Sequence, residues 1–371
     1  MVRREQRQRL GGIGGGVHMI AQAGEKPGQG LPDAFFVVHD EHGRAIGGNS
    51  WRSHGRQRCG SYLGASMSRL RTNLAAVPGI TVGHTTIEAH GTGCTVVLAP
   101  EAGMRAAVCV RGRATGTREL DVMDPRHLVE RIDAILFTGG SALGLGAADG
   151  VMRWLRERGR GLPVGDMGTI PIVPSAVIFD LGNAGKPPGW ASGDDAYRAC
   201  EAATEDYADG RVGAGRGATC GKAAGLEKMI PAGIGSWAAQ FGDVIVSALV
   251  VVNAVGDIRN GRGEIIAGKV DSLRYLAEGG APLGDPARLN RNTTLAVIAT
   301  NADIDRVQLQ ALAQTGSDAL ARRITPYGTL FDGDVIFTVS TAAVRPKSPL
   351  QVDAIAALVV PEAVERSVRH G

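Results

Sequence analysis

Apolar residues fall into blocks from about residue 77 onward, and the length and spacing of each block predict its secondary structure. Long apolar or β-branched runs at residues 244–255, 294–300 and 335–339 predict buried strands. Apolar positions at helix spacing predict helices over residues 303–320 and 352–368. Strands and helices are mixed without strict alternation, so a layered α+β fold is favoured over a doubly wound parallel sheet.

Shorter apolar blocks predict the elements of the first half of the chain. Residues 95–99 and 106–110 are joined by a turn containing Pro and Gly, which predicts a hairpin. A short strand over residues 135–138 is followed by two glycines and a helix over 141–156, with Ser141 as its N-cap. This segment lacks the G-x-G-x-x-G and Walker patterns, so close packing of strand and helix explains its glycines better than phosphate binding does.

Residues 1–66 differ from the rest of the chain. They are rich in Gly, Arg, Gln and His, and their one apolar patch, at residues 35–38, has no sustained period of a helix or a strand. We therefore expect a disordered extension, with Met67 as the natural first residue. Residues 67–371 are expected to form a single hydrolase domain. A peptide from residues 1–60, found by mass spectrometry of the native protein, would contradict a start at Met67.

Composition and charge argue against several functional classes for this protein. The chain has 371 residues, of which 44% are hydrophobic, and its net charge of +3 is too small to indicate nucleic-acid binding. Five cysteines without a C-x-x-C motif predict reduced thiols in a cytoplasmic protein. No apolar run is long enough to predict a membrane span. The eight histidines lack the spacing of a metal site, so we expect no metal.

The triplet Asn292-Thr293-Thr294 stands where a long polar loop, predicted over residues 256–292, meets an apolar strand. If the peptide bond before Thr293 is cut, the hydroxyl becomes an N-terminal nucleophile. The new α-amine, with an ordinary pKa of about 7.7–8.0, is then suited to act as its base. The same triplet is also typical of ordinary turn and strand residues, so the pattern alone leaves both interpretations open.

Two carboxylates precede the last predicted strand, in the segment Phe331-Asp332-Gly333-Asp334. If the strand already begins here, Asp332 and Asp334 face the same side, and their repulsion raises the pKa of at least one. Such a pair could orient a nucleophile or stabilise an ammonium group. The alternative is a solvated β-turn, for which Asp-Gly is a strong signal.

Lys222 and Asn253 are the remaining polar candidates. Asn253 ends an otherwise apolar strand, and a buried amide there needs hydrogen-bond partners and suits an oxyanion hole. Lys222 lies in the Gly-rich stretch of residues 213–225. An ordinary exposed lysine and a strand-end turn residue are the alternatives for these two positions.

Seven stretches are spread along the part of the chain from about residue 80 to residue 368: PGITVGHTT, ILFTGGSALGLGAADG, IPIVPSAVIFDL, GRVGAGRGATCGKA, ALVVVNAVGDI, NTTLAVIATNA and FDGDVIFTVST. Together they resemble the DmpA-type family of self-processing aminopeptidases and esterases. Within that family they are most similar to the branch of endo-type 6-aminohexanoate-oligomer (nylon-oligomer) hydrolases.

The resemblance implies roles for individual residues. Its catalytic set corresponds to Thr293, Asn253, Asp332, Asp334 and Lys222. Thr293 matches the nucleophile, and the Asn292–Thr293 bond matches the self-cleavage site. The two aspartates would position the nucleophile and its amine, and Asn253 would lie near the oxyanion. Phe179 stands in the substrate site where the nylon-oligomer hydrolases carry a tyrosine, and its phenyl ring cannot donate a hydrogen bond.

The resemblance also implies the architecture and the reaction. The expected fold is a four-layer αββα sandwich, like that of N-terminal-nucleophile hydrolases but with different connectivity. Cleavage would give fragments 67–292 and 293–371, assembled as a homotetramer of cleaved heterodimers. The expected substrates are small peptides, amino-acid amides or esters, or related oligoamides, hydrolysed without a cofactor. The alternatives are an N-acyltransferase that uses the same threonine and an inactive binding homologue.

Overall fold

A computed structural model describes residues 18–23, 34–39, 45–49, 71–280 and 291–369, and it separates the chain into two units, Met1–Ser66 and Met67–Gly371. In the first unit three strands pair antiparallel in chain order: β1 (His18–Ala23), β2 (Ala34–His39) and β3 (Ala45–Asn49). The sequence predicted no regular structure here. The central strand contains the apolar patch at residues 35–38, whose aromatic and β-branched residues favour strands. A natural start at Met67 stays a prediction.

The second unit is built on two sheets that each contain a parallel pair of strands. The five-stranded sheet has the order β4 (Thr81–Ile87), β5 (Thr92–Leu98), β9 (Ala134–Thr138), β12 (Ser175–Val177) and β7 (Thr117–Arg118). The six-stranded sheet has the order β15 (Ile234–Phe241), β16 (Val244–Asn253), β19 (Thr293–Ala302), β21 (Val335–Val344), β6 (Met104–Val110) and β8 (Arg131–Ile132). The parallel pairs are β9 with β12 and β19 with β21.

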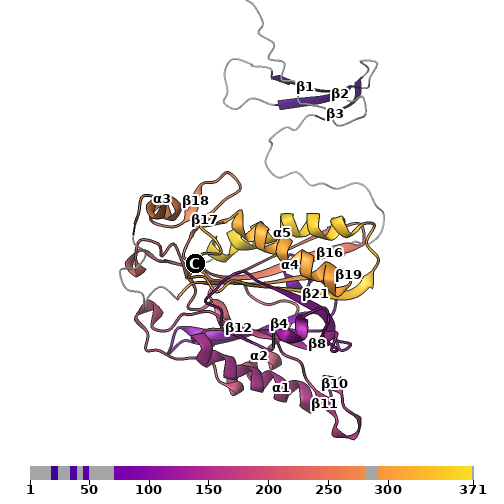
Figure 1. Cartoon of the computed structure of the whole chain (residues 1–371), viewed down its shortest axis with the longest axis vertical. Helices are drawn as coiled ribbons and strands as arrows, with labels where there is room; N and C mark the ends of the chain where they lie inside the picture. The colour runs from indigo at the N-terminus through magenta and orange to yellow at the C-terminus, as the bar shows by residue number, and fades with distance from the viewer. Residues whose placement is uncertain (1–17, 24–33, 40–44, 50–70, 281–290, 370–371) are drawn as a thin grey trace, which may run out of the picture. The chain divides into compact units, whose positions relative to one another are not determined.

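Helices cover the outer faces of both sheets. The helices α4 (Arg306–Ala321) and α5 (Pro349–Arg369) pack on the six-stranded sheet, and α1 (Ala148–Glu157) and α2 (Gly193–Glu201) pack on the five-stranded sheet. Figure 1 shows these pairs on opposite outer sides of this unit. One apolar cluster fills the space between the sheets, and two others lie beneath the helix pairs. The layer order confirms the predicted four-layer α+β sandwich.

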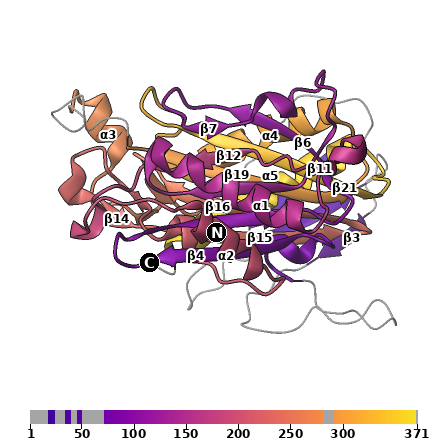
Figure 2. The ribbon, with the colours of Figure 1, turned by 90° about the horizontal axis from the view of Figure 1, so that it is seen from below.

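Short elements complete the second unit. The short strands are β10 (Leu162–Pro163), β11 (Thr169–Ile170), β13 (Thr219–Cys220), β14 (Ile230–Pro231), β17 (Asp257–Arg259), β18 (Ile265–Ala267) and β20 (Ile324–Thr325). Helix α3 (Ser272–Ala277) lies near one end of this unit, as Figure 2 shows. The prediction of a long loop over residues 256–292 is therefore wrong for residues 257–277, which contain β17, β18 and α3. Residues 281–290 of that range lie outside the described residues.

Two local predictions also fail. The strands β5 and β6 do not form a hairpin: β5 pairs with β4 and β9, whereas β6 pairs with β21 and β8 in the other sheet. The turn between them carries the chain from one sheet to the other. Ser141 does not cap a helix, since it has a φ of 55° and is itself the first residue of a 3-10 helix, Ser141–Ala147, that precedes α1.

The central strands of the six-stranded sheet bring distant polar residues to one edge. All ten residues of β16 and all ten of β19 are buried, which agrees with their long apolar runs. The two strands are antiparallel, so that Asn253 at the end of β16 is opposite Thr293 at the start of β19. Strand β21 runs parallel to β19, with Val335 opposite Leu295. The segment before β21 therefore lies beside the Asn292–Thr293 bond.

Candidate active site

The hydroxyl of Thr293 lies against the carbonyl group of the residue before it. Thr293 Oγ1 donates a hydrogen bond of 2.6 Å to the Asn292 carbonyl oxygen. The same oxygen accepts the Gly333 N–H at 2.8 Å. Asn292 and Thr293 are only 1% and 4% exposed. The bond that sequence reasoning selected for cleavage is thus buried, with its hydroxyl adjacent and a backbone donor on its carbonyl.

Gly333 packs so closely on this bond that no other residue fits without a shift. A Cβ atom there would lie 2.6 Å from the Ala114 carbonyl oxygen and 2.9 Å from Thr293 Oγ1. Asn292 also forms a parallel bridge with Asp332. In the sequence, Gly333 is recognisable only as the glycine between two aspartates. Its position next to the threonine hydroxyl depends on the pairing of β19 with β21. No feature of the neighbouring sequence indicates that position.

The two aspartates are buried and held by different donors. Asp334 Oδ1 accepts the Thr294 N–H at 2.5 Å, and Asp334 Oδ2 accepts the Gly328 N–H at 3.2 Å. Asp332 Oδ2 accepts both the N–H and the hydroxyl of Thr329, at 2.9 and 2.6 Å. Asp332 and Asp334 are 2% and 1% exposed, so the solvated turn is wrong. They precede β21 and are not part of it.

Burial and proximity perturb the acid–base behaviour of this pair. Burial raises the pKa of the Asp332 carboxyl. Burial, together with the neighbouring Asp332, raises the pKa of the Asp334 carboxyl well above its usual range. Because its pKa is raised, the Asp334 carboxyl keeps its proton to a higher pH than an exposed aspartate does.

Lys222 and Asn253 form one hydrogen-bonded unit. Lys222 Nζ donates to the Asn253 carbonyl oxygen and to Asn253 Oδ1, each at 2.9 Å, and to the Arg291 carbonyl oxygen at 3.0 Å. Asn253 Nδ2 donates to the carbonyl oxygens of Arg291 and Phe179, at 3.0 and 3.2 Å. Lys222 is 2% exposed, so the ordinary exposed lysine is wrong. Burial lowers its pKa to about 7.

The amide of Asn253 lies beside the backbone just before the predicted cleavage bond. In the uncut chain it holds the carbonyl one residue upstream, at Arg291. The Asn292 carbonyl oxygen itself accepts the Gly333 N–H, and a role for Asn253 near the oxyanion stays a prediction. The half-buried ring of Phe179 lies beneath the Arg291 guanidinium group, whose central carbon is 4.8 Å from the ring centroid. Every site residue predicted from the sequence therefore belongs to one connected cluster.

A buried carboxylate that sequence reasoning missed borders this cluster. Asp180, directly after Phe179, is fully buried and accepts the Thr92 hydroxyl and the Gly140 N–H, each at 2.7 Å. Burial raises its pKa to about 6. Gly139 approaches so closely that a Cβ there would lie 2.2 Å from Asp180 Oδ2. Its position directly after an apolar run is the sequence feature that could have identified Asp180 as a buried carboxyl group.

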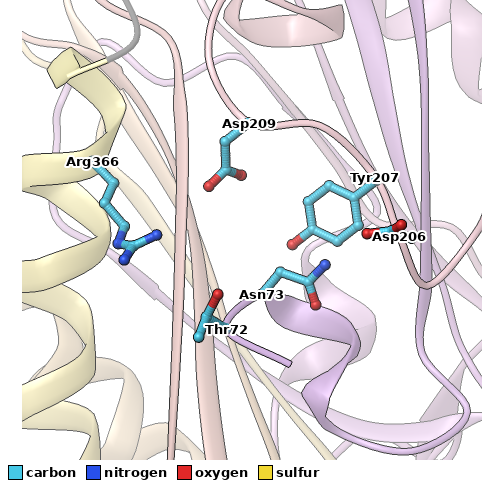
Figure 3. Close-up of a pocket in the computed structure, with 6 residues that line it drawn as sticks. All are labelled: Thr72, Asn73, Asp206, Tyr207, Asp209 and Arg366. Atoms are coloured by element: carbon cyan, nitrogen blue, oxygen red, sulfur yellow. The ribbon is translucent and has the colours of Figure 1, made fainter. Parts of the chain in front are cut away.

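Other classes of site find little support in the described part of the chain. Among those residues, no group of three or more His, Cys, Asp or Glu side chains could hold a metal ion. No helix among them is long and apolar enough to cross a membrane. A separate hollow is lined by Thr72, Asn73, Asp206, Tyr207, Asp209 and Arg366 (Figure 3). Its Tyr207 and Asp209 side chains are engaged by Ser236, and none of its lining residues belongs to the Thr293 cluster.

The sequence is similar to known peptidases and amide hydrolases. The model of peptidase family S58 matches residues 72–371. An uncharacterized aminopeptidase of Mycobacterium tuberculosis is 41% identical over 268 residues, which cover 68% of this chain and 74% of the relative. A 6-aminohexanoate-oligomer endohydrolase of Kocuria sp. is 33% identical over 274 residues, covering 71% of this chain and 73% of that protein.

A solved structure with the same architecture is the L-aminopeptidase D-Ala-esterase/amidase from Ochrobactrum anthropi, which is described as a new variant among the Ntn hydrolase fold. The TM-score is 0.60 at 20% sequence identity, and the match covers 80% of this chain and 85% of that one. An identity this low supports the fold alone. The shared fold confirms the predicted N-terminal-nucleophile-like sandwich.

Proposed function

The chain belongs to peptidase family S58. From that premise we propose that it is a self-processing amide hydrolase of the N-terminal-nucleophile type, with Thr293 as its nucleophile. The proposed maturation step cuts the Asn292–Thr293 bond. The substrates would be small peptides, amino-acid amides or esters, or related oligoamides, in line with the named activities of its relatives. The hydrogen bond from Thr293 Oγ1 to the Asn292 carbonyl carries the proposal.

Self-cleavage would proceed as an N-to-O acyl shift. Thr293 Oγ1 attacks the Asn292 carbonyl carbon, the C–N bond breaks, and the hydroxyl proton passes to the departing nitrogen. The Gly333 N–H lies 2.8 Å from the oxygen that becomes negative, the geometry expected of an oxyanion donor. The buried carboxyl pair would carry the proton between the two atoms. Water then hydrolyses the ester and leaves Thr293 with a free α-amine.

Turnover would use the same atoms with the α-amine as base. The amine takes the hydroxyl proton, Oγ1 attacks the substrate amide, and the resulting ammonium protonates the leaving amine. Asp332 Oδ1 has no hydrogen-bond partner among the described residues, so it is available to the new ammonium group. Asp334, fixed by two backbone N–H groups, would hold the start of β19 in place. We propose the Gly333 amide as oxyanion donor in both steps.

The proposal includes the products and their assembly. Cleavage would give a larger fragment that ends at Asn292 and a smaller one of residues 293–371. We propose a tetramer of the cleaved heterodimers, which rests on the family resemblance. Light scattering of the cleaved protein would test the assembly separately from the chemistry.

A denaturing gel with N-terminal sequencing tests the nucleophile. The smaller fragment should begin Thr-Thr-Leu-Ala-Val. Thr293→Ala should stay one chain and be inactive, whereas Thr293→Ser, which keeps a hydroxyl, should still be cut. The rate should not depend on protein concentration, because the attack is intramolecular. A cleaved Thr293→Ala protein would refute the mechanism, and a rate that rises with concentration would indicate a protease acting in trans.

A further inference from the structure

The peptide group that contains the Gly333 N–H is also held from its other side. This N–H shares a trans peptide group with the Asp332 carbonyl, and the two point in opposite directions. The N–H donates to the Asn292 carbonyl oxygen at 2.8 Å. The Asp332 carbonyl oxygen accepts the N–H groups of Arg113 and Ala114, at 2.9 and 3.0 Å. Two donors, one peptide group and the reacting carbonyl therefore form a continuous chain of hydrogen bonds.

The four residues that follow β6, Arg111–Ala114, supply these donors, and we name them the donor segment. In a regular ladder each carbonyl oxygen accepts one N–H from the neighbouring strand. Here the first two N–H groups of the donor segment both donate to the Asp334 carbonyl oxygen, at 3.0 and 3.2 Å, and the last two both donate to that of Asp332. The segment before β21 thus receives twice the usual number of donors.

Two glycines allow the two segments to come this close. A Cβ atom at Gly112 would lie 2.2 Å from the Asp332 carbonyl oxygen and 2.3 Å from the Asp334 nitrogen. A Cβ atom at Gly333 would lie 2.6 Å from the Ala114 carbonyl oxygen. Neither glycine has a φ in the left-handed region. Close contact between the two backbones, and not an unusual backbone conformation, therefore requires glycine at both positions.

Hydrogen bonds to a carbonyl oxygen strengthen the N–H donor of the same peptide group, because they draw electron density away from its nitrogen. The benefit is largest when the acceptor becomes negative, as an oxyanion does. In the uncut chain the Asn292 carbonyl oxygen also accepts the Thr293 hydroxyl, at 2.6 Å. This second bond is lost when the hydroxyl oxygen attacks the carbonyl carbon, whereas the Gly333 N–H stays in place.

We propose that the donor segment is a positioning element of the reaction. Its last two N–H groups act through the Asp332 carbonyl to aim the Gly333 N–H at the developing oxyanion and to polarise it. The inference rests on the proposed function, because an oxyanion forms at Asn292 only if Thr293 attacks its carbonyl group.

The first two N–H groups of the donor segment provide an internal control. They donate to the Asp334 carbonyl oxygen, and the N–H of that peptide group belongs to Val335. They therefore hold the same segment in place without polarising the Gly333 N–H. A purely structural role would make both halves of the donor segment equally important for cleavage, whereas the proposed role makes the second half more important.

Replacing single backbone amides with esters would test this difference. Cell-free translation with a suppressor tRNA can carry out Ala114→lactic acid or Gly112→glycolic acid, each of which exchanges one N–H for an oxygen and keeps the side chain. Each ester removes one hydrogen bond, so in the uncut Thr293→Ala background both should lower the thermal transition by similar amounts. With Thr293 present, self-cleavage of the ester at 114 should be about threefold or more slower than that of the ester at 112. The fragments are followed on a denaturing gel.

Equal cleavage rates of the two esters, or faster cleavage of the ester at 114, would overturn the inference. Loss of a cooperative thermal transition in the ester at 114 alone would also overturn it, because the segment would then hold the fold and not the donor. Wild-type protein made in the same way keeps the two proposals apart. A wild-type fragment that begins at Thr293 preserves the proposed nucleophile even if the two esters behave alike. Wild-type protein that stays whole overturns the proposed function, and this inference with it.

Discussion

Replacing Gly333 with alanine should slow self-cleavage strongly while leaving the fold in place. The backbone at Gly333 is not in the left-handed region, so alanine is excluded only by space. To reach ordinary contact distance, Thr293 Oγ1 would have to retreat by about 0.5 Å and the Ala114 oxygen by about 0.8 Å. Such crowding costs about 1–3 kcal/mol of stability.

The kinetic effect of the alanine should be larger than its effect on stability. A shift of this size moves the hydroxyl and the Gly333 N–H away from the Asn292 carbonyl. Loss of one oxyanion donor costs about 10²–10³ in rate. The assay is a time course of the two fragments on a denaturing gel, alongside thermal unfolding of the same protein. Gly146→Ala is the matched control, because a Cβ there meets no atom within 4 Å. Cleavage of Gly333→Ala at the wild-type rate would refute the assigned geometry.

Three further predictions follow from the same cluster. Asp334→Asn keeps the shape but removes the carboxyl proton and turns one of the two oxygens that accept the Thr294 and Gly328 N–H groups into a donor. Hydrolysis should fall by about 10²–10⁴, and the thermal transition should fall too, because a buried donor then faces a backbone N–H; wild-type turnover would remove Asp334 from the scheme. The pKa of Lys222 is about 7 in the folded chain, against an ordinary value of 10.5, so the unfolded chain binds more protons between these values. The free energy of unfolding should therefore rise with pH from about 7 to 10.5. Urea unfolding in the uncut Thr293→Ala background should show a flatter pH dependence for Lys222→Met; an unchanged slope would contradict the buried ammonium. Phe179→Tyr supplies a phenol donor, so hydrolysis of 6-aminohexanoate oligomers should rise by about tenfold or more while self-cleavage stays unchanged; equal rates would exclude a role for the phenol.

The central sheet could be predicted because its strands carry their own signal. The apolar runs at residues 244–255 and 294–300 correspond closely to β16 and β19, since strands buried on both faces need apolar residues throughout. The apolar runs that became β5 and β6 were also found. Their assignment to different sheets could not be, because local pattern does not record which layer a strand joins.

The candidate residues could be selected from the sequence, whereas their contacts could not. Lys222 lies in a Gly-rich stretch and is buried only because its ammonium group reaches the end of β16 and the carbonyl of Arg291. Gly333 acquires its position from the parallel pairing of β19 with β21. The same long-range pairing turns Asp332 and Asp334 inward. Such contacts join segments that are tens of residues apart, and no local period encodes them.

Burial of the Asn292–Thr293 bond and of the donors beside it implies that cleavage must come before substrate binding. Asn292 and Thr293 are nearly inaccessible in the uncut chain, and the donors of Lys222 and Asn253 are already satisfied by Arg291. A substrate carbonyl therefore has neither space nor free donors until the new C-terminus moves away. The uncut Thr293→Ala protein should not bind acetyl-asparagine amide in a calorimetric titration, whereas the cleaved wild type should. Equal affinity of the two proteins would show that substrate reaches the site by another route and that cleavage serves only to free the amine.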